Sequence, residues 1–189
     1  MINYKKINLQ CLDNLKSYVF NQIKDSITSA KSSAVASSVI TLPDELLKIV
    51  NDELSSYNIS NIDYCRIYIW PKGSVQYIHV DGASEVLHCA VNIPIYGGDN
   101  SKFQWFDGNF KLEPKNILRT DQKAYYINWE STPHIAESIE IKDGCYLIRI
   151  NQPHRAIAAA DSDRWIFTMR FKDNPTFEEL YDKLPTSNI

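Results

Sequence analysis

The sequence predicts a mainly β protein in which helices flank a sandwich or closed barrel of short strands. Between residues 61 and 171 the chain consists of short β-like apolar runs. Turns rich in Gly, Pro, Asn and Asp separate these runs: PKG, GGDN, DGN, KDG and NQP. Aromatic residues are plentiful, with 11 Tyr, 7 Phe and 4 Trp, which suits a β-rich fold with a lined pocket. Many short strands with such turns are typical of sandwiches and barrels.

The first 60 residues are expected to form a helical support. The segment LDNLKSYVFNQIKDS has apolar residues at three- to four-residue spacing, which predicts one apolar helix face: Leu15, Val19, Phe20 and Ile23. The following KSSAVASSV is small and polar, and we expect a loop or a weak helix there. A second helix is predicted within TLPDELLKIVNDELSSY, which starts with a helix-entry signal. Its apolar stripe is Leu46, Leu47, Val50 and Leu54.

Nine runs are predicted as strands of the β-rich part: NIDYCRIYIW, SVQYIHV, EVLHCAVNIPIY, KFQWF, KAYYINW, ESIEI, CYLIRI, HRAIAA and RWIFTMRF. A polar helix, NPTFEELYDKL, is expected to follow them. The chain has no internal repeat and no evident linker. We therefore expect one domain over residues 1–189, with support in 1–60, the β core in 61–172 and a C-terminal helix and tail in 173–189.

Composition is that of an ordinary soluble globular protein, with 44% hydrophobic and 23% charged residues among 189. The net charge of -3 and pI near 5.8 give no footprint for binding nucleic-acid backbones. No segment is apolar for long enough to span a membrane. The start MINYKKINLQ lacks the apolar core of a secretory signal, and the four cysteines show no CxxC spacing. We therefore expect reduced cysteines and a cytoplasmic location.

A histidine and an aspartate two residues apart end the run SVQYIHVDG. Residues at this spacing on an extended strand point to the same face, so His79 and Asp81 can converge on a metal ion. An HxD pair arises readily by chance. In the alternative interpretation His79 is a half-buried histidine near a turn, and Asp81 serves the turn at Gly82.

A second histidine near the end of the chain strengthens the metal interpretation. His154 begins the run HRAIAA, and Arg164 begins the next run, RWIFTMRF. Two imidazoles and one carboxylate form the facial triad of non-haem Fe(II) oxygenases, which leaves three metal positions open. Arg164 has the planar, permanently charged group that binds the distal carboxylate of a 2-oxo acid. If its strand pairs antiparallel with that of His154, it lies beside the open side of the metal.

The order of these residues resembles the Fe(II)- and 2-oxoglutarate-dependent dioxygenases. The similarity covers about residues 62 to 172 and follows the family pattern of HxD, a distal His and an Arg about ten residues further on. It implies a double-stranded β-helix, which is a cupin-like jelly roll, with a triad of His79, Asp81 and His154 and 2-oxoglutarate held by Arg164. It also implies Fe(II) as cofactor, O₂ as co-substrate and a hydroxylase-type reaction. The motifs are also similar to those of small oxygenase-like proteins of bacteria and phages.

Two of these assignments have competitors. His134, in STPH, also follows a proline, but it has no arginine ten residues on and lies in a polar segment. We therefore favour His154 as the distal ligand, with His134 at the mouth of the pocket or on the surface. Arg170 shares strand parity with Arg164, so both can face inward. The family offset favours Arg164, and Arg170 is then a second carboxylate contact, a substrate contact or, as we favour, a salt-bridged structural residue.

Further residues are candidates for the pocket by strand parity. Tyr77 shares a face with His79 and, like Tyr68 and Asn92, is a candidate donor to the 2-oxoglutarate carboxylates. In the alternative interpretation the tyrosines pack the barrel, and Asn92 fixes the turn that follows it. His88 is expected to be a core or pocket-wall residue rather than a ligand. Trp105 is expected either in the core or in the pocket wall.

Two functions are compatible with these observations. The first is an oxygenase acting on a small molecule, an amino acid or a peptide side chain. The second is a binding module that kept the jelly-roll scaffold without turnover. The complete triad together with Arg164 favours the enzyme, because a site without turnover has no physical need for all four groups. No feature of the sequence indicates an oligomeric state.

Overall fold

A six-stranded antiparallel sheet is the largest element of the computed structural model, which describes residues 2–27, 36–59, 61–82, 85–115 and 124–187. The strands lie in the order β1, β10, β5, β12, β3, β2. Their bounds are β1 Tyr4–Ile7, β2 Ala36–Ile40, β3 Ile62–Trp70, β5 Cys89–Tyr96, β10 Cys145–Arg149 and β12 Arg164–Phe171. Strand β12 pairs with both β5 and β3, and every residue of it is buried.

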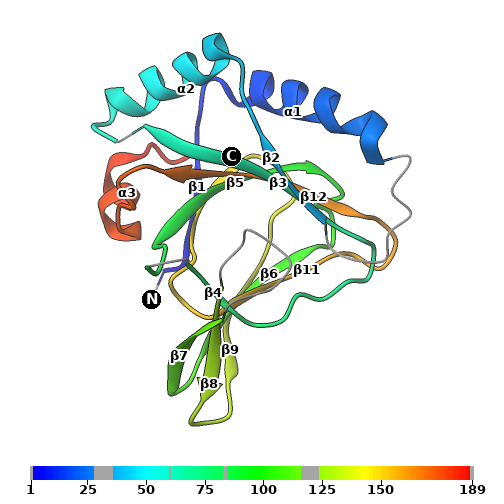
Figure 1. The fold of residues 1–189 in the computed structure, drawn as a ribbon, viewed down its shortest axis with the longest axis vertical. Helices are drawn as coiled ribbons and strands as arrows, with labels where there is room; N and C mark the ends of the chain where they lie inside the picture. The colour runs from blue at the N-terminus through cyan, green and yellow to red at the C-terminus, as the bar shows by residue number, and fades with distance from the viewer. Residues whose placement is uncertain (1, 28–35, 60, 83–84, 116–123, 188–189) are drawn as a thin grey trace.

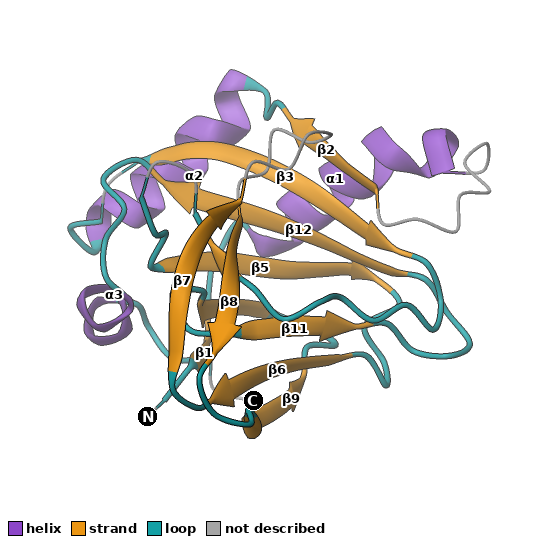
Figure 2. Cartoon of the chain, turned by 60° about the horizontal axis from the view of Figure 1, so that its bottom comes forward, coloured by secondary structure: helices purple, strands orange, loops and turns teal. Residues whose placement is uncertain are grey.

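Two smaller antiparallel sheets of three strands each complete the β part. One has the order β11 His154–Ile157, β6 Lys102–Asp107, β9 His134–Glu140. The other has the order β4 Val80–Asp81, β8 Ala124–Trp129, β7 Phe110–Lys115. A bridge between His79 and His154 ties the chain just before β4 to β11. Figure 1 shows β6 and β11 on the side of the large sheet that faces away from α1 and α2, and in Figure 2 β7 and β8 lie in front.

Three helices accompany the sheets: α1 Leu12–Ile27, α2 Asp44–Ser56 and α3 Phe177–Lys183. Helices α1 and α2 lie on one side of the large sheet and the small sheets on the other (Figure 1). A helix-side core packs apolar helix residues such as Leu15, Val19 and Leu54 against sheet residues such as Ile67 and Phe167. None of the helices described here is both long and apolar enough to cross a membrane.

Strand alternation divides β12 between two environments. Trp165, Phe167 and Met169 belong to the helix-side core, whereas Ile166 belongs to a second core between the sheets. Because successive side chains point to opposite faces, Arg164, Thr168 and Arg170 share the inter-sheet face with Ile166. The predicted common parity of Arg164 and Arg170 is therefore confirmed. This alternation places three polar groups in the interior.

The predicted mainly β class and the predicted helices are confirmed, with Leu15, Val19, Val50 and Leu54 buried as expected.

Three details of the prediction are wrong. Phe20 is 39% exposed and stacks on Trp165 at the margin of the helix-side core. Residues 36–39 of KSSAVASSV, together with Ile40, form β2, because the edge of β3 offers them a partner. Residues 31–35 lie outside the described part. SVQYIHV is mostly irregular, held by two isolated bridges and the short β4. Strands β1 and β7 were not predicted.

Gly97 permits a close backbone approach that positions the start of β12. Its φ is 65°, and a Cβ placed there would lie 1.6 Å from the carbonyl oxygen of Asp163. Asp163 directly precedes Arg164. Gly73 has a similar φ of 71°, but a Cβ there would meet nothing within 4 Å. The two glycines therefore share a backbone conformation and differ in their surroundings.

We expect Gly97→Ala to lower the free energy of unfolding far more than Gly73→Ala does. Both variants incur the cost of a left-handed conformation, roughly 1–2 kcal/mol. Only Gly97→Ala adds a clash with backbone, which must displace Asp163 and the first residue of β12. Urea denaturation of the two variants and the wild type measures both effects. Equal losses in the two variants would contradict the close-approach role of Gly97.

Candidate metal centre

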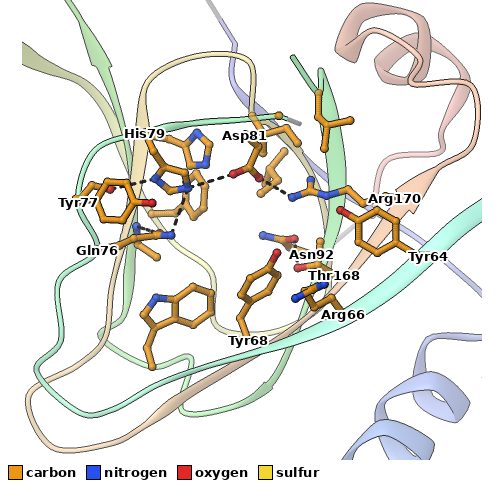
Figure 3. A pocket seen from close by; sticks show the side chains of 18 of the residues that line it. Tyr64, Arg66, Tyr68, Gln76, Tyr77, His79, Asp81, Asn92, Thr168 and Arg170 are labelled. Atoms are coloured by element: carbon orange, nitrogen blue, oxygen red, sulfur yellow. Dashed lines mark hydrogen bonds and ion pairs between the residues drawn. The ribbon is translucent and has the colours of Figure 1, made fainter. Parts of the chain in front are cut away.

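A cavity of about 410 Å³ lies between the inner face of the large sheet and the chain around β4 and β11. Its size falls within the usual range of ligand pockets, about 300–1,000 Å³. The strands β3 and β12 supply one wall. The opposite wall consists of the irregular segment from Gln76 to Gly82 and the start of β11 (Figure 3). Each wall therefore combines two segments that are more than 70 residues apart in the sequence.

His79, Asp81 and His154 meet at one point in this cavity. One ligand atom from each, imidazole nitrogen or carboxylate oxygen, lies within 4.8 Å of the others. His79 Nε2 is 3.1 Å from Asp81 Oδ1. Both histidines are buried, at 5% and 2% exposure. The three residues that sequence spacing and parity singled out are therefore adjacent in space.

Backbone hydrogen bonds fix this meeting point. The His79 N–H donates to the His154 carbonyl over 3.1 Å, and the His154 N–H donates to the His79 carbonyl over 2.9 Å. The Asp81 N–H donates to the Ile150 carbonyl over 3.2 Å. The HxD segment is thus paired with residues 150–154 although most of SVQYIHV is irregular. A reciprocal pair of this kind sets the two imidazoles directly opposite each other.

The tautomers of both histidines follow from their hydrogen bonds. His79 Nδ1 lies 3.0 Å from the Tyr77 carbonyl oxygen, and His154 Nδ1 lies 2.8 Å from the Gln152 carbonyl oxygen. Since a carbonyl oxygen only accepts, each Nδ1 must carry the proton. Each Nε2 therefore presents a lone pair. Metal-binding histidines are oriented by this type of outer hydrogen bond.

Arg170 holds the carboxylate of the group. Its Nη2 donates to Asp81 Oδ2 over 2.5 Å, which leaves Oδ1 on the side of His79. Burial acts to raise the pKa of Asp81, but the positive charge of the adjacent Arg170 outweighs it. The pKa of Asp81 therefore lies below its usual range, and the carboxylate stays ionised.

His154 is held in the neutral form. Burial, and next the neighbouring His79, lower its pKa from 6.5 to about 3. A neutral imidazole is the form that binds a metal ion. At neutral pH the group thus offers a neutral imidazole at His154 and an anionic carboxylate at Asp81.

Gln76 also belongs to the group, and the sequence analysis missed it. Its Nε2 lies 3.3 Å from His79 Nε2, and its Oε1 accepts from the Ala156 N–H over 3.1 Å. The Gln76 N–H in turn donates to the Ala156 carbonyl over 2.9 Å. No parity argument reaches Gln76, because it lies in the irregular part of the wall. Its side-chain amide is nevertheless fixed beside Nε2 of His79.

The far end of the cavity holds buried donors without partners. Arg164 is 1% exposed, and within the described residues none of its three guanidinium nitrogens has a hydrogen-bond partner. Trp70 packs 5.1 Å from the Arg164 guanidinium, and its Nε1 is likewise buried and unpartnered there. Burial lowers the pKa of Arg164 to about 9, which still leaves it charged at neutral pH. Buried polar groups without partners are rare and indicate an absent ligand or water.

Three other predicted pocket residues line the cavity. Tyr68 is partly buried on β3, and burial raises its pKa to about 12, so its hydroxyl stays protonated. Asn92 is buried on β5, where its Oδ1 accepts from the Thr168 hydroxyl over 2.8 Å. Tyr77 is 51% exposed at the rim, with its ring 5.2 Å from that of His79.

The remaining candidates lie outside this cavity. His134 is exposed at the start of β9, opposite Asp107. His88 is half-buried, and its Nδ1 is 3.2 Å from the Asn151 amide, so it is not a pocket-wall residue. Trp105 is a core residue whose Nε1 donates to the Arg149 carbonyl over 2.8 Å.

The expected pairing of the His154 and Arg164 strands is wrong. Strand β11 pairs with β6, whereas β12 pairs with β3 and β5 of the large sheet. The turn between β11 and β12 therefore crosses from one side of the sandwich to the other. Arg164 reaches the cavity from the wall opposite His154, and this arrangement leaves room between them.

The donor set fits an Fe(II) ion. Two neutral imidazoles and one carboxylate satisfy part of an octahedral shell and leave adjacent positions for other ligands. Both imidazoles and the carboxylate have outer hydrogen bonds that orient them. The unpartnered guanidinium at the far end fits the distal carboxylate of a 2-oxo acid.

The depressed pKa of His154 predicts a pH dependence of stability in the metal-free protein. Between pH 6.5 and about 3 the unfolded chain binds a proton on this residue and the folded protein does not. The free energy of unfolding therefore falls as the pH falls, by up to about 1.4 kcal/mol per pH unit. Urea unfolding at pH 7.0, about 5.5 and about 4.5 measures the slope.

His154→Asn should remove this part of the slope, whereas His134→Asn, which deletes an exposed imidazole, should keep it. Because both variants lose one histidine, the difference between their slopes reports the effect of burying the imidazole. Identical slopes in His154→Asn and the wild type would contradict a buried neutral His154.

Comparisons with known proteins agree with this geometry at the level of the fold. No protein-family model and no curated protein matches the sequence. A viral collagen prolyl hydroxylase from Paramecium bursaria Chlorella virus-1, solved with 2-oxoglutarate, matches 89% of this chain and 94% of its own, with 11% identity and a TM-score of 0.50. A Pseudomonas putida prolyl-4-hydroxylase matches 89% and 90%, with 13% identity and a TM-score of 0.48.

A vicilin from hazelnut, Corylus avellana, matches 76% of this chain but only 31% of its own length, with 9% identity and a TM-score of 0.40. The chain thus spans about a third of the vicilin and nearly all of the two hydroxylases. The fold is the double-stranded β-helix, and the resemblance to the Fe(II)- and 2-oxoglutarate-dependent dioxygenases is confirmed at the level of that fold.

Proposed function

We propose that the protein is an Fe(II)- and 2-oxoglutarate-dependent oxygenase of the hydroxylase type. One observation supports this most directly: a facial triad and a buried, unpartnered guanidinium line the same cavity. The triad alone fits several metal-dependent functions. Arg164 alone fits any buried anion. Together they fit a metal-chelating 2-oxo acid with a second carboxylate.

In this proposal His79 and His154 bind the metal through Nε2, and Asp81 binds through Oδ1. Arg170 is a positioning residue that occupies the other carboxylate oxygen and keeps Asp81 ionised. When bound, Fe(II) with 2-oxoglutarate and O₂ supplies the oxidising chemistry that the family resemblance implies. The protein supplies the orientation of each donor before the metal arrives, because the outer hydrogen bonds are already in place.

Arg164 is proposed to bind the distal carboxylate of 2-oxoglutarate, with Trp70 Nε1 as a second donor at that end. Tyr68 and Asn92 are proposed to contact the same co-substrate, and the protonated phenol of Tyr68 is suited to donate. Tyr77 at the rim is proposed to contact the primary substrate. That substrate is a small molecule, an amino acid or a peptide side chain that enters past this rim.

Loss of a triad histidine should abolish the metal site without touching the co-substrate residues. We expect anaerobic addition of Fe(II) and 2-oxoglutarate to the wild type to give a weak visible charge-transfer band. His154→Ala should lose this band and lower Mn(II) affinity by at least tenfold. His134→Ala, an exposed imidazole outside the cavity, should behave like the wild type.

Circular dichroism establishes that the variants are folded. Unchanged metal affinity in His154→Ala would sink the triad assignment. A wild type that binds metal but gives neither the band nor succinate from 2-oxoglutarate would favour a binding module on the same scaffold.

Removal of the Arg164 guanidinium should weaken 2-oxoglutarate binding and leave metal binding nearly intact. Loss of one charge-assisted pair in a partly buried site costs about 2–5 kcal/mol, which is more than tenfold in affinity. Isothermal titration of 2-oxoglutarate into Mn(II)-loaded Arg164→Ala measures this. Arg155→Ala is the matched control, because Arg155 lies on β11 outside the cavity and bonds to Gln104.

Arg170→Ala separates the two arginines. It should lower Mn(II) affinity, because Asp81 then loses the partner that fixes its carboxylate. The proposed roles would be reversed if Arg164→Ala bound 2-oxoglutarate normally and Arg170→Ala bound metal but not 2-oxoglutarate.

A further inference from the structure

Three guanidinium groups of the described residues line the cavity, and one of them has no role in the proposed function. Arg170 is paired with Asp81, and Arg164 is assigned to the co-substrate. The third, Arg66 on β3, donates from Nη1 to the Ser37 hydroxyl over 3.2 Å. Within the described parts of the chain, no ion pair involves Arg66. The hydrogen-bond partner that the described residues give its guanidinium is a neutral hydroxyl, so no acid in those residues balances its positive charge.

Arg66 lies in a cross-strand row that leads from the edge of the large sheet to its centre. The register places Val39 beside Arg66, Arg66 beside Thr168 and Thr168 beside Asn92. All four residues line the cavity. Val39, at the edge, is 58% exposed, whereas Thr168 and Asn92 are buried and bonded to each other. Figure 3 shows Arg66 next to Thr168 and Tyr68.

Arg66 is remote from the end of the cavity that is assigned to 2-oxoglutarate. Arg164 lies opposite Trp70 in the register and packs on its ring. Arg66 precedes Trp70 by four residues on the same face of β3, which is about 13 Å along a strand. A co-substrate that spans from Arg164 to the triad thus leaves the Arg66 end of the cavity to another ligand.

We propose that the primary substrate carries a carboxylate and that Arg66 binds it, which makes Arg66 a specificity-determining residue. The inference rests on the proposed function, because it takes the Arg164 end as the co-substrate site. The planar guanidinium fork binds a carboxylate through two parallel hydrogen bonds. One guanidinium balances the single charge of a carboxylate, whereas a phosphate carries nearly two charges. The charge count therefore favours a carboxylate.

Titration of simple acids into the loaded protein tests this proposal. The probes are the common free amino acids and simple monocarboxylic acids, each beside its primary amide, with inorganic phosphate as a separate arm. Isothermal titration is performed at saturating Mn(II) and 2-oxoglutarate. We expect the wild type to bind at least one carboxylate and to bind the matching amide at least tenfold more weakly.

Arg66→Gln should lower the affinity for that carboxylate by at least tenfold and leave the affinity for 2-oxoglutarate unchanged. Arg66→Lys, which keeps the charge but not the fork, should lose less. Arg155→Gln removes a guanidinium outside the cavity and should match the wild type.

Four results would overturn the role of Arg66. Two concern the wild type: it binds none of the carboxylates, or it binds inorganic phosphate more tightly than any carboxylate. Two concern Arg66→Gln: it keeps full carboxylate affinity, or it loses 2-oxoglutarate affinity tenfold. The last would assign Arg66 to the co-substrate.

Failure of the proposed function gives a different result, namely no 2-oxoglutarate binding by the wild type. The carboxylate titrations of wild type and Arg66→Gln are then performed with Mn(II) alone. They support or overturn the carboxylate site by the same criteria.

Discussion

The ion pair between Arg170 and Asp81 is the contact on which the geometry of the site depends. Arg170 lies on β12, at the centre of the large sheet, and Asp81 lies on the short β4 of the opposite wall. The pair joins the two walls at the group formed by His79, Asp81 and His154. It keeps the carboxylate ionised and directs Oδ1 toward His79. Removal of one partner from such a buried pair leaves an uncompensated charge, typically at a cost of about 3–5 kcal/mol. Stability and ligand orientation therefore depend on the same two side chains.

The position of that pair follows from the two cores of the fold. The helix-side core takes one face of β12, and its apolar residues leave the other face to Arg164, Thr168 and Arg170. The smaller core between the sheets closes around this polar strip, with Phe103 stacked on the His154 ring at 5.1 Å. Apolar neighbours deprive the ionisable groups of water, which is why the pKa of His154 falls and that of Tyr68 rises. The sandwich thus sets both where these groups lie and which protonation state they adopt.

Local rules account for the parts of the site that were predicted from the sequence. The spacing of His79 and Asp81 and the shared parity of Arg164 and Arg170 are properties of a single extended segment, so no tertiary information was needed. The predictions that failed depend on tertiary contacts. Strand β2 forms because β3 offers it an edge, and β11 and β12 pair with different sheets although they adjoin in sequence. Gln76 lies in an irregular segment, where parity does not apply.

The unpartnered donors at the far end of the cavity are the strongest argument that the fold is shaped for a ligand. Arg164 and Trp70 together contribute four buried nitrogens without a partner among the described residues. A charged group that is buried without a partner lowers the free energy of unfolding. A leucine at residue 164 would fill the same space without this desolvation penalty. Arg170, six residues on, is paired with Asp81 of the opposite wall, so the fold can supply an acid partner for a buried guanidinium on this strand. Among the described residues Arg170 has an acid partner and Arg164 has none, although two nitrogens of Arg170 also lack a hydrogen-bond partner there. A structural role for both arginines does not explain this difference. An anionic ligand that reaches Arg164 would supply the missing partner, and in the proposed function the triad in the same cavity holds the metal that binds the other end of that ligand.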